Sequence, residues 1–138
     1  LENCAQAVEQ LAKQRVMAMV EPFISERKNG SIVNDLSPEA VIKSMAIASG
    51  LASTSAYTWL KLPVVDDIER VMEASTLPAL NLGGEVRKDA EAAMESWRKA
   101  LELPNVKGLV IGRSLLFPPD NDVATAVDAT VQILNNTN

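Results

Sequence analysis

Tyr57-Thr58-Trp59-Leu60-Lys61-Leu62-Pro63-Val64-Val65 is the stretch that decides the fold. Its residues are almost all apolar or aromatic, as in a strand covered by helices, and Pro63 ends it because proline cannot donate to a ladder. Lys61 stands near the carboxyl end of this strand. The strand alone leaves three explanations open for it: a structural ion pair, a side chain that reaches past the strand to water, or an amine that attacks a carbonyl.

Composition limits the class of protein. The chain has 138 residues, 47% of them hydrophobic, and a mean hydropathy of +0.04, which indicates one globular domain. A net charge of -5 without a basic run argues against nucleic-acid binding. The apolar runs are strand-sized, so no membrane span is expected. The lone Cys4 fits a reducing cytosol, and the absence of histidine excludes imidazole catalysis.

The chain begins inside a helical pattern, in which Ala5, Val8 and Ala12 share one face. There is no initiator methionine and no signal-peptide pattern. We therefore expect residues 1–138 to start partway through a domain.

One helix and then four strand–helix units follow from the pattern of apolar residues and caps. A polar loop is expected at 25–31, and Ser37-Pro38 and Asp66 with Glu69 predict helix starts. The predicted strands are 16–21, 54–64, 77–84 and 106–114, and the predicted helices are 1–15, 37–50, a segment after Asp66, 88–103 and 123–134.

Parallel strands covered by helices leave two architectures, an open doubly wound sheet or part of a (βα)8 barrel. Alternation favours the barrel, because a large inward Trp59 needs small residues across from it. The residues expected to share inner faces are Tyr57, Trp59 and Lys61; Ala79, Asn81 and Gly83; and Gly108, Val110 and Gly112. The alternative is that the glycines only mark turns and close helix packing.

Polar or glycine-rich residues end all four predicted strands: Glu21, Lys61, Gly83-Gly84 and Gly112-Arg113. In parallel α/β folds this edge is where sites form. Lys61 is the candidate nucleophile for a Schiff base, and Glu21 is the candidate proton-transfer group or simply its ion-pair partner.

The two glycine-rich endings predict a phosphate site, with backbone N–H groups at Gly83, Gly84 and Gly112 and the guanidinium of Arg113. Asn81 is a further candidate substrate contact. No cofactor or metal site is expected, because the aspartates near helix starts are better explained as caps, namely Asp66, Asp120 and Asp122.

Several motifs resemble the second half of class I aldolase-like (βα)8 barrels, a group that includes deoxyribose-phosphate, tagatose-bisphosphate and archaeal-type fructose-bisphosphate aldolases. The matching segments are 20–23, 34–39, 57–63 and 112–120. The resemblance implies that residues 1–138 are strands five to eight of one barrel domain. It implies that Lys61 forms the Schiff base and Glu21 moves protons on a small phosphorylated sugar, aldehyde, ketone or keto acid. Glycines 83, 84 and 112 and Arg113 would hold the phosphate.

The same resemblance implies a cytoplasmic, homo-oligomeric lyase of carbohydrate or inositol catabolism that needs no metal. An acidic residue on strand one and a lysine on strand four would lie upstream of Leu1. Asn81-Leu82-Gly83 stands where the family often has a serine, so phosphate binding departs from the family pattern. Two other hypotheses remain: a non-catalytic phosphosugar-binding barrel, and a fragment that is inactive alone.

Overall fold

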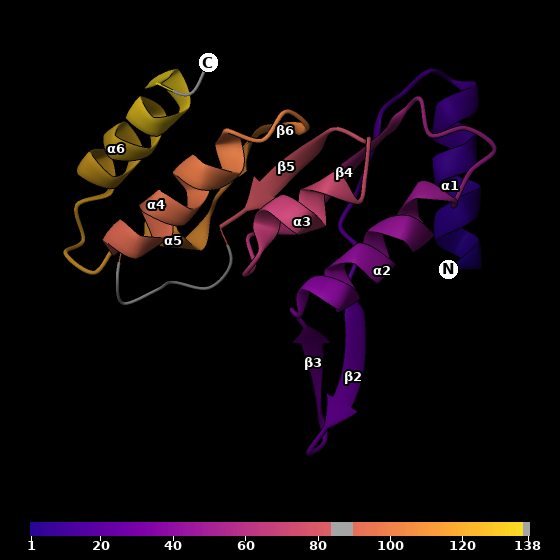
Figure 1. The fold of residues 1–138 in the computed structure, drawn as a ribbon, viewed down its shortest axis with the longest axis horizontal. Helices are drawn as coiled ribbons and strands as arrows, with labels where there is room; N and C mark the ends of the chain where they lie inside the picture. The colour runs from indigo at the N-terminus through magenta and orange to yellow at the C-terminus, as the bar shows by residue number, and fades with distance from the viewer. Residues whose placement is uncertain (84–89, 137–138) are drawn as a thin grey trace.

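The computed structural model describes residues 1–83 and 90–136. Figure 1 shows how the helices and strands follow one another along the chain. The elements are α1 (Glu2–Lys13), β1 (Ala18–Val20), β2 (Ile24–Lys28), β3 (Ser31–Asp35), α2 (Pro38–Ser49), β4 (Thr58–Pro63), α3 (Ile68–Glu73), β5 (Ala79–Leu82), α4 (Ala90–Leu101), β6 (Val106–Val110), α5 (Arg113–Leu116) and α6 (Val123–Asn136).

Four parallel strands form the main sheet in the order β1-β4-β5-β6. The predicted α/β fold with a parallel sheet is therefore confirmed, although every strand is shorter than predicted. Within the described residues, β1 and β6 each pair with one neighbour and form the edges of the sheet.

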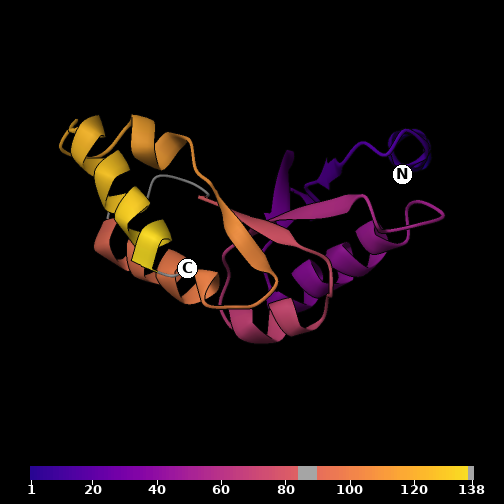
Figure 2. The ribbon, with the colours of Figure 1, turned by 90° about the horizontal axis from the view of Figure 1, so that it is seen from above.

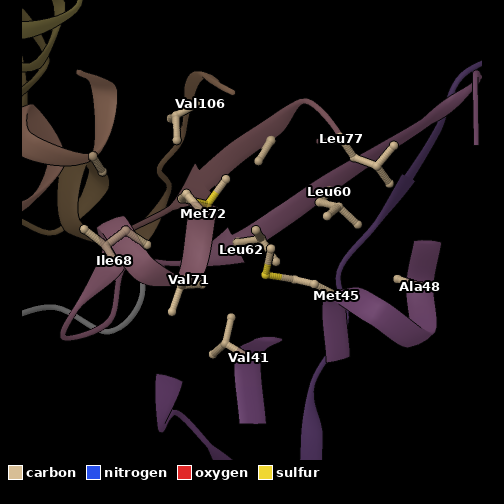
Figure 3. Packing of buried hydrophobic residues seen from close by; sticks show 12 residues of the cluster. Val41, Met45, Ala48, Leu60, Leu62, Ile68, Val71, Met72, Leu77 and Val106 are labelled. Carbon is tan, nitrogen blue, oxygen red and sulfur yellow. The ribbon is translucent and has the colours of Figure 1, made fainter. Parts of the chain in front are cut away.

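Helices α2, α3 and α4 lie on one face of this sheet (Figure 2). Leu60 and Leu62 of β4 point to that face and are fully buried, and they pack in one cluster with Met45 of α2 and Val71 of α3 (Figure 3). Full burial of one such leucine stabilises the fold by about 1.5–3 kcal/mol. This cluster holds β4 rigidly in the middle of the sheet.

The opposite face of β4 carries Trp59 and Lys61, which are only half-buried. Leu80 pairs with Lys61 and Gly108 pairs with Leu80, so these residues share the less covered face. Gly108 lies at a bulge with φ +157, a conformation that favours glycine. This register agrees with the prediction that Trp59 and Gly108 lie on the same face of the sheet.

The predicted face of the third strand is wrong. Ala79 pairs with Leu60 and Asn81 pairs with Leu62, so both lie on the helix-covered face rather than opposite Trp59.

Of the two predicted helix starts, one is confirmed and one is wrong. Ser37 Oγ accepts from Ala40 N–H at 3.3 Å, which confirms the cap of α2. The capping box at Asp66 is wrong, because α3 begins after Asp67, whose carboxylate instead meets Arg70.

The expected polar loop at 25–31 is an antiparallel hairpin, β2–β3, which forms a second sheet of its own. In Figure 1 it projects away from the main sheet beyond α2. Asn29 and Gly30 have φ values of 51 and 82, as a two-residue type I′ turn requires. At the other end of the hairpin, Ser37 N–H donates to Asp35 at 2.9 Å and lowers the pKa of this carboxyl.

No helix in the described part of the chain is both long and apolar enough to cross a membrane.

Candidate active site

Strand register brings the two predicted catalytic residues together. Val20, the last residue of β1, pairs with Leu60 of β4. Glu21 directly follows Val20 and therefore lies beside Lys61, which directly follows Leu60. The Lys61 Nζ donates to Glu21 Oε2 at 2.9 Å. Both side chains therefore meet at the carboxyl end of the parallel strands, where α/β folds form their sites.

The Lys61–Glu21 pair remains in contact with solvent, since the two side chains are 26% and 40% exposed. An ion pair with this exposure stabilises a protein by no more than about 1 kcal/mol. At 2.9 Å a proton can pass directly between the amine and the carboxylate. The geometry thus permits proton transfer between Lys61 and Glu21. The ion pair itself contributes little to the stability of the fold.

A cavity of about 850 Å³ lies next to this pair at the carboxyl ends of the strands. Glu21, Gly83 and Arg113 line it, and Lys61 contacts this lining through Glu21. Arg113 is the one cation among the described lining residues, which makes its surroundings favourable for an anion. The remaining described residues of the lining are Phe23, Ile32, Val33, Asn34, Leu36, Pro63, Val64, Leu82, Ser96 and Trp97.

The predicted glycines differ in their surroundings. A Cβ on Gly83 would lie 2.7 Å from Ile111 Cγ2, so close packing against Ile111 by itself accounts for a glycine there. A Cβ on Gly112 would have no atom of the described residues within 4 Å, so their packing does not account for this glycine. Gly84 lies outside the described residues.

Asn81 does not belong with these residues, which corrects the prediction that it contacts substrate. Its side chain is on the helix-covered face beside Leu62 and is completely buried. Neither its amide nitrogen nor its amide oxygen has a hydrogen-bond partner in the part of the chain that the structure describes. An unsatisfied buried amide costs roughly 1–3 kcal/mol, so Asn81 is a source of instability in this fold.

The hairpin residues that line the cavity were missed as site residues. Phe23 precedes β2, Ile32, Val33 and Asn34 belong to β3, and Leu36 follows it. Asn29-Gly30 was the available signal, because this dipeptide between two extended runs is typical of a tight hairpin.

Within residues 1–83 and 90–136, no group of three or more His, Cys, Asp or Glu side chains could hold a metal ion.

A family model described as Cgl0159-like matches residues 1–131. The crystal structure of Cgl0159 from Corynebacterium glutamicum is 51% identical, with a TM-score of 0.93, over 98% of this chain and 45% of that chain. No curated protein matches the sequence.

Two fructose-1,6-bisphosphate aldolase structures share the fold at low identity. An archaeal enzyme is 20% identical with a TM-score of 0.74, over 96% of this chain and 50% of that chain. A Schiff-base-forming enzyme is 22% identical with a TM-score of 0.73, over 94% of this chain and 49% of that chain. The chain therefore spans about half the length of these solved structures, and the likeness to the aldolases concerns the fold alone.

Proposed function

The chain belongs to the Cgl0159-like family, and from this membership and its aldolase-like fold we propose that residues 1–138 are the C-terminal half of one class I aldolase-like (βα)8 barrel. Among the described residues, four parallel strands, two sheet edges and one sheet face without a helix layer support this proposal. So does the match to about half of each solved chain. Strands β1, β4, β5 and β6 would be strands five to eight of that barrel.

In the proposed reaction, Lys61 attacks the carbonyl carbon of a small phosphorylated substrate. Addition of the neutral amine gives a carbinolamine, and loss of water gives an iminium. A base takes the proton of the hydroxyl group on the β carbon, the bond between the α and β carbons breaks, and its electron pair passes to the iminium, which releases an aldehyde and leaves an enamine. Protonation of the enamine and hydrolysis then release the second product and restore the amine. The reverse sequence forms the bond.

Glu21 is proposed to move the protons of these steps. Its carboxylate is 2.9 Å from Nζ and also lines the cavity, so it can reach both the amine and a bound hydroxyl. The substrate phosphate is proposed to bind Arg113 and the backbone N–H groups around Gly83, Gly84 and Gly112. Asn81 is left out because its side chain is buried on the other face.

The observation that carries the proposal is the contact between Lys61 and Glu21 at the edge of a cavity that also contains Arg113. The test is borohydride reduction of the full-length protein with candidate sugar phosphates, followed by peptide mapping. We expect a reduced adduct on Lys61 and its loss in Lys61→Met. The control is Lys107→Met, which removes another lysine from the same sheet. Full cleavage activity in Lys61→Met would end the Schiff-base proposal.

A non-catalytic phosphosugar-binding barrel is the second candidate, favoured by the ion pair that already engages Lys61. It predicts phosphosugar binding that survives Lys61→Ala and no trapped adduct. Under the half-barrel proposal, the isolated 138 residues lack part of the site and are inactive, whereas the full-length enzyme assembles as a homo-oligomer.

A further inference from the structure

We propose that the cavity selects a phosphorylated aldehyde or ketone whose end farthest from the phosphate is poor in hydroxyl groups, and that the β2–β3 hairpin makes this selection. The inference rests on the proposed function, because it places the substrate carbonyl at Lys61 and the phosphate at Arg113. It adds the chemical class of the remaining end of the substrate.

The first argument is the uneven composition of the cavity. The charged groups follow main-sheet strands, because Glu21 comes directly after β1 and Arg113 begins α5, shortly after β6. The hairpin side contributes a surface that we call the hairpin wall, which consists of Phe23, Ile32, Val33, Asn34 and Leu36. All of these residues except Asn34 are apolar. A ligand that reaches from Arg113 past Lys61 therefore ends against an apolar surface.

The second argument is the shortage of polar side chains on the hairpin wall. The one polar side chain of the hairpin wall is Asn34, and its Oδ1 already accepts from Ser25 Oγ at 2.7 Å. A chain with many hydroxyl groups would lose water at this surface without gaining equivalent hydrogen bonds, which is costly. A methyl or methylene group loses nothing there and gains burial.

The third argument is the exposure of the hairpin wall. Ile32, Val33 and Leu36 are large apolar side chains in contact with solvent, although they lie on a strand and at its end. A small apolar group bound in the cavity would remove part of this surface from water. A site of this kind distinguishes substrates by single methyl and hydroxyl groups, as apolar pockets commonly do.

The test compares two ketones that differ by one hydroxyl group. Dihydroxyacetone phosphate carries a hydroxymethyl group where hydroxyacetone phosphate carries a methyl group. Dissociation constants of both for the full-length protein are measured by calorimetry. We expect hydroxyacetone phosphate to bind about fivefold more tightly or better, because the additional hydroxyl group would be buried against the hairpin wall without a hydrogen-bond partner.

The matched variants are Val33→Thr in the hairpin wall and Val16→Thr, which lies just before the amino end of β1. The two valines are 44% and 46% exposed, so the same exchange is made at similar sites. We expect Val33→Thr to remove most of the preference and Val16→Thr to keep it. Equal or tighter binding of dihydroxyacetone phosphate to the unmodified protein would overturn the inference, as would an unchanged preference in Val33→Thr or no binding of either ketone.

Borohydride trapping on the same samples separates this inference from the proposed function. An adduct on Lys61 without tighter binding of hydroxyacetone phosphate would support the Schiff-base proposal and overturn the proposed role of the hairpin. A methyl preference in binding without an adduct would leave the role of the hairpin and overturn the Schiff base.

Discussion

Replacement of Glu21 by glutamine distinguishes proton transfer from a merely structural ion pair. Glutamine has nearly the same shape and can still accept a hydrogen bond from Lys61 Nζ, which now lies 2.9 Å from the carboxylate. It cannot take up and return a proton. The variant therefore removes the proposed chemistry while it keeps most of the geometry.

The expected magnitudes are far apart. Proton transfer by a positioned side chain accelerates a reaction about 10²–10⁴-fold, so the cleavage rate should fall by at least about 100-fold. The partly exposed ion pair contributes no more than about 1 kcal/mol, so the melting temperature should fall by no more than about 2–4 °C. A large kinetic effect with a small stability effect is the signature of a proton-transfer residue.

The assay is the steady-state cleavage rate of the full-length protein with its best trapped sugar phosphate, together with thermal unfolding. Glu39→Gln is the matched control, because Glu39 forms an exposed ion pair with Arg70 away from the cavity. A rate loss in Glu21→Gln of less than about fivefold, or one matched by Glu39→Gln, would refute the role of Glu21 in proton transfer.

Three further predictions concern stability. Leu62→Ala, at a fully buried position, should lower the free energy of unfolding by about 2–5 kcal/mol in denaturant titrations. Asn81→Leu replaces an unsatisfied buried amide by an apolar side chain of similar size and should leave stability unchanged or raise it by about 1 kcal/mol, with phosphosugar affinity unaltered; a loss of affinity would restore Asn81 to the site. Hydrogen bonds from Ser53 lower the pKa of Glu9, so this contact stabilises the fold above the unfolded pKa of about 4.5 and is lost as the pH falls through the lowered folded pKa. The free energy of unfolding of Glu9→Gln, measured by denaturant titration, should therefore be lower than that of the unmodified protein at neutral pH and equal to it in acid. A difference in this free energy that does not change with pH would contradict the linkage.

Local signals predicted the parts of the fold that depend on local chemistry. The apolar run around Leu60 fixed the central strand, and Ser37-Pro38 fixed the start of α2, because caps and buried strands are encoded in neighbouring residues. The proximity of Glu21 and Lys61 was also predictable, since both end parallel strands.

Side-chain orientation on β5 was not predictable in the same way. Ala79–Leu82 is a strand of four residues, and its two leucines alternate with alanine and asparagine. The apolar pattern alone favours the leucines for the core. The register with β4 instead turns Asn81 into the core, and register is a property of the whole sheet.

The last helix shows a similar limit. Helical spacing favours a core stripe of Val123, Val127 and Val131, yet all three are exposed, and Thr130 and Ile133 are buried instead. The helical spacing was right, but two apolar stripes compete on α6, and contact with α4 decides between them.

The hairpin forms its own two-stranded sheet, and no strand of it is part of the main ladder. Backbone hydrogen bonds of the main sheet therefore do not depend on the length or sequence of the hairpin. An insertion or exchange between Phe23 and Leu36 can remodel the cavity rim while Glu21 and Lys61 keep their register. For an engineer, this makes the segment a natural place to graft new loops, and under the proposed function it separates the residues that would select a substrate from those that would react with it.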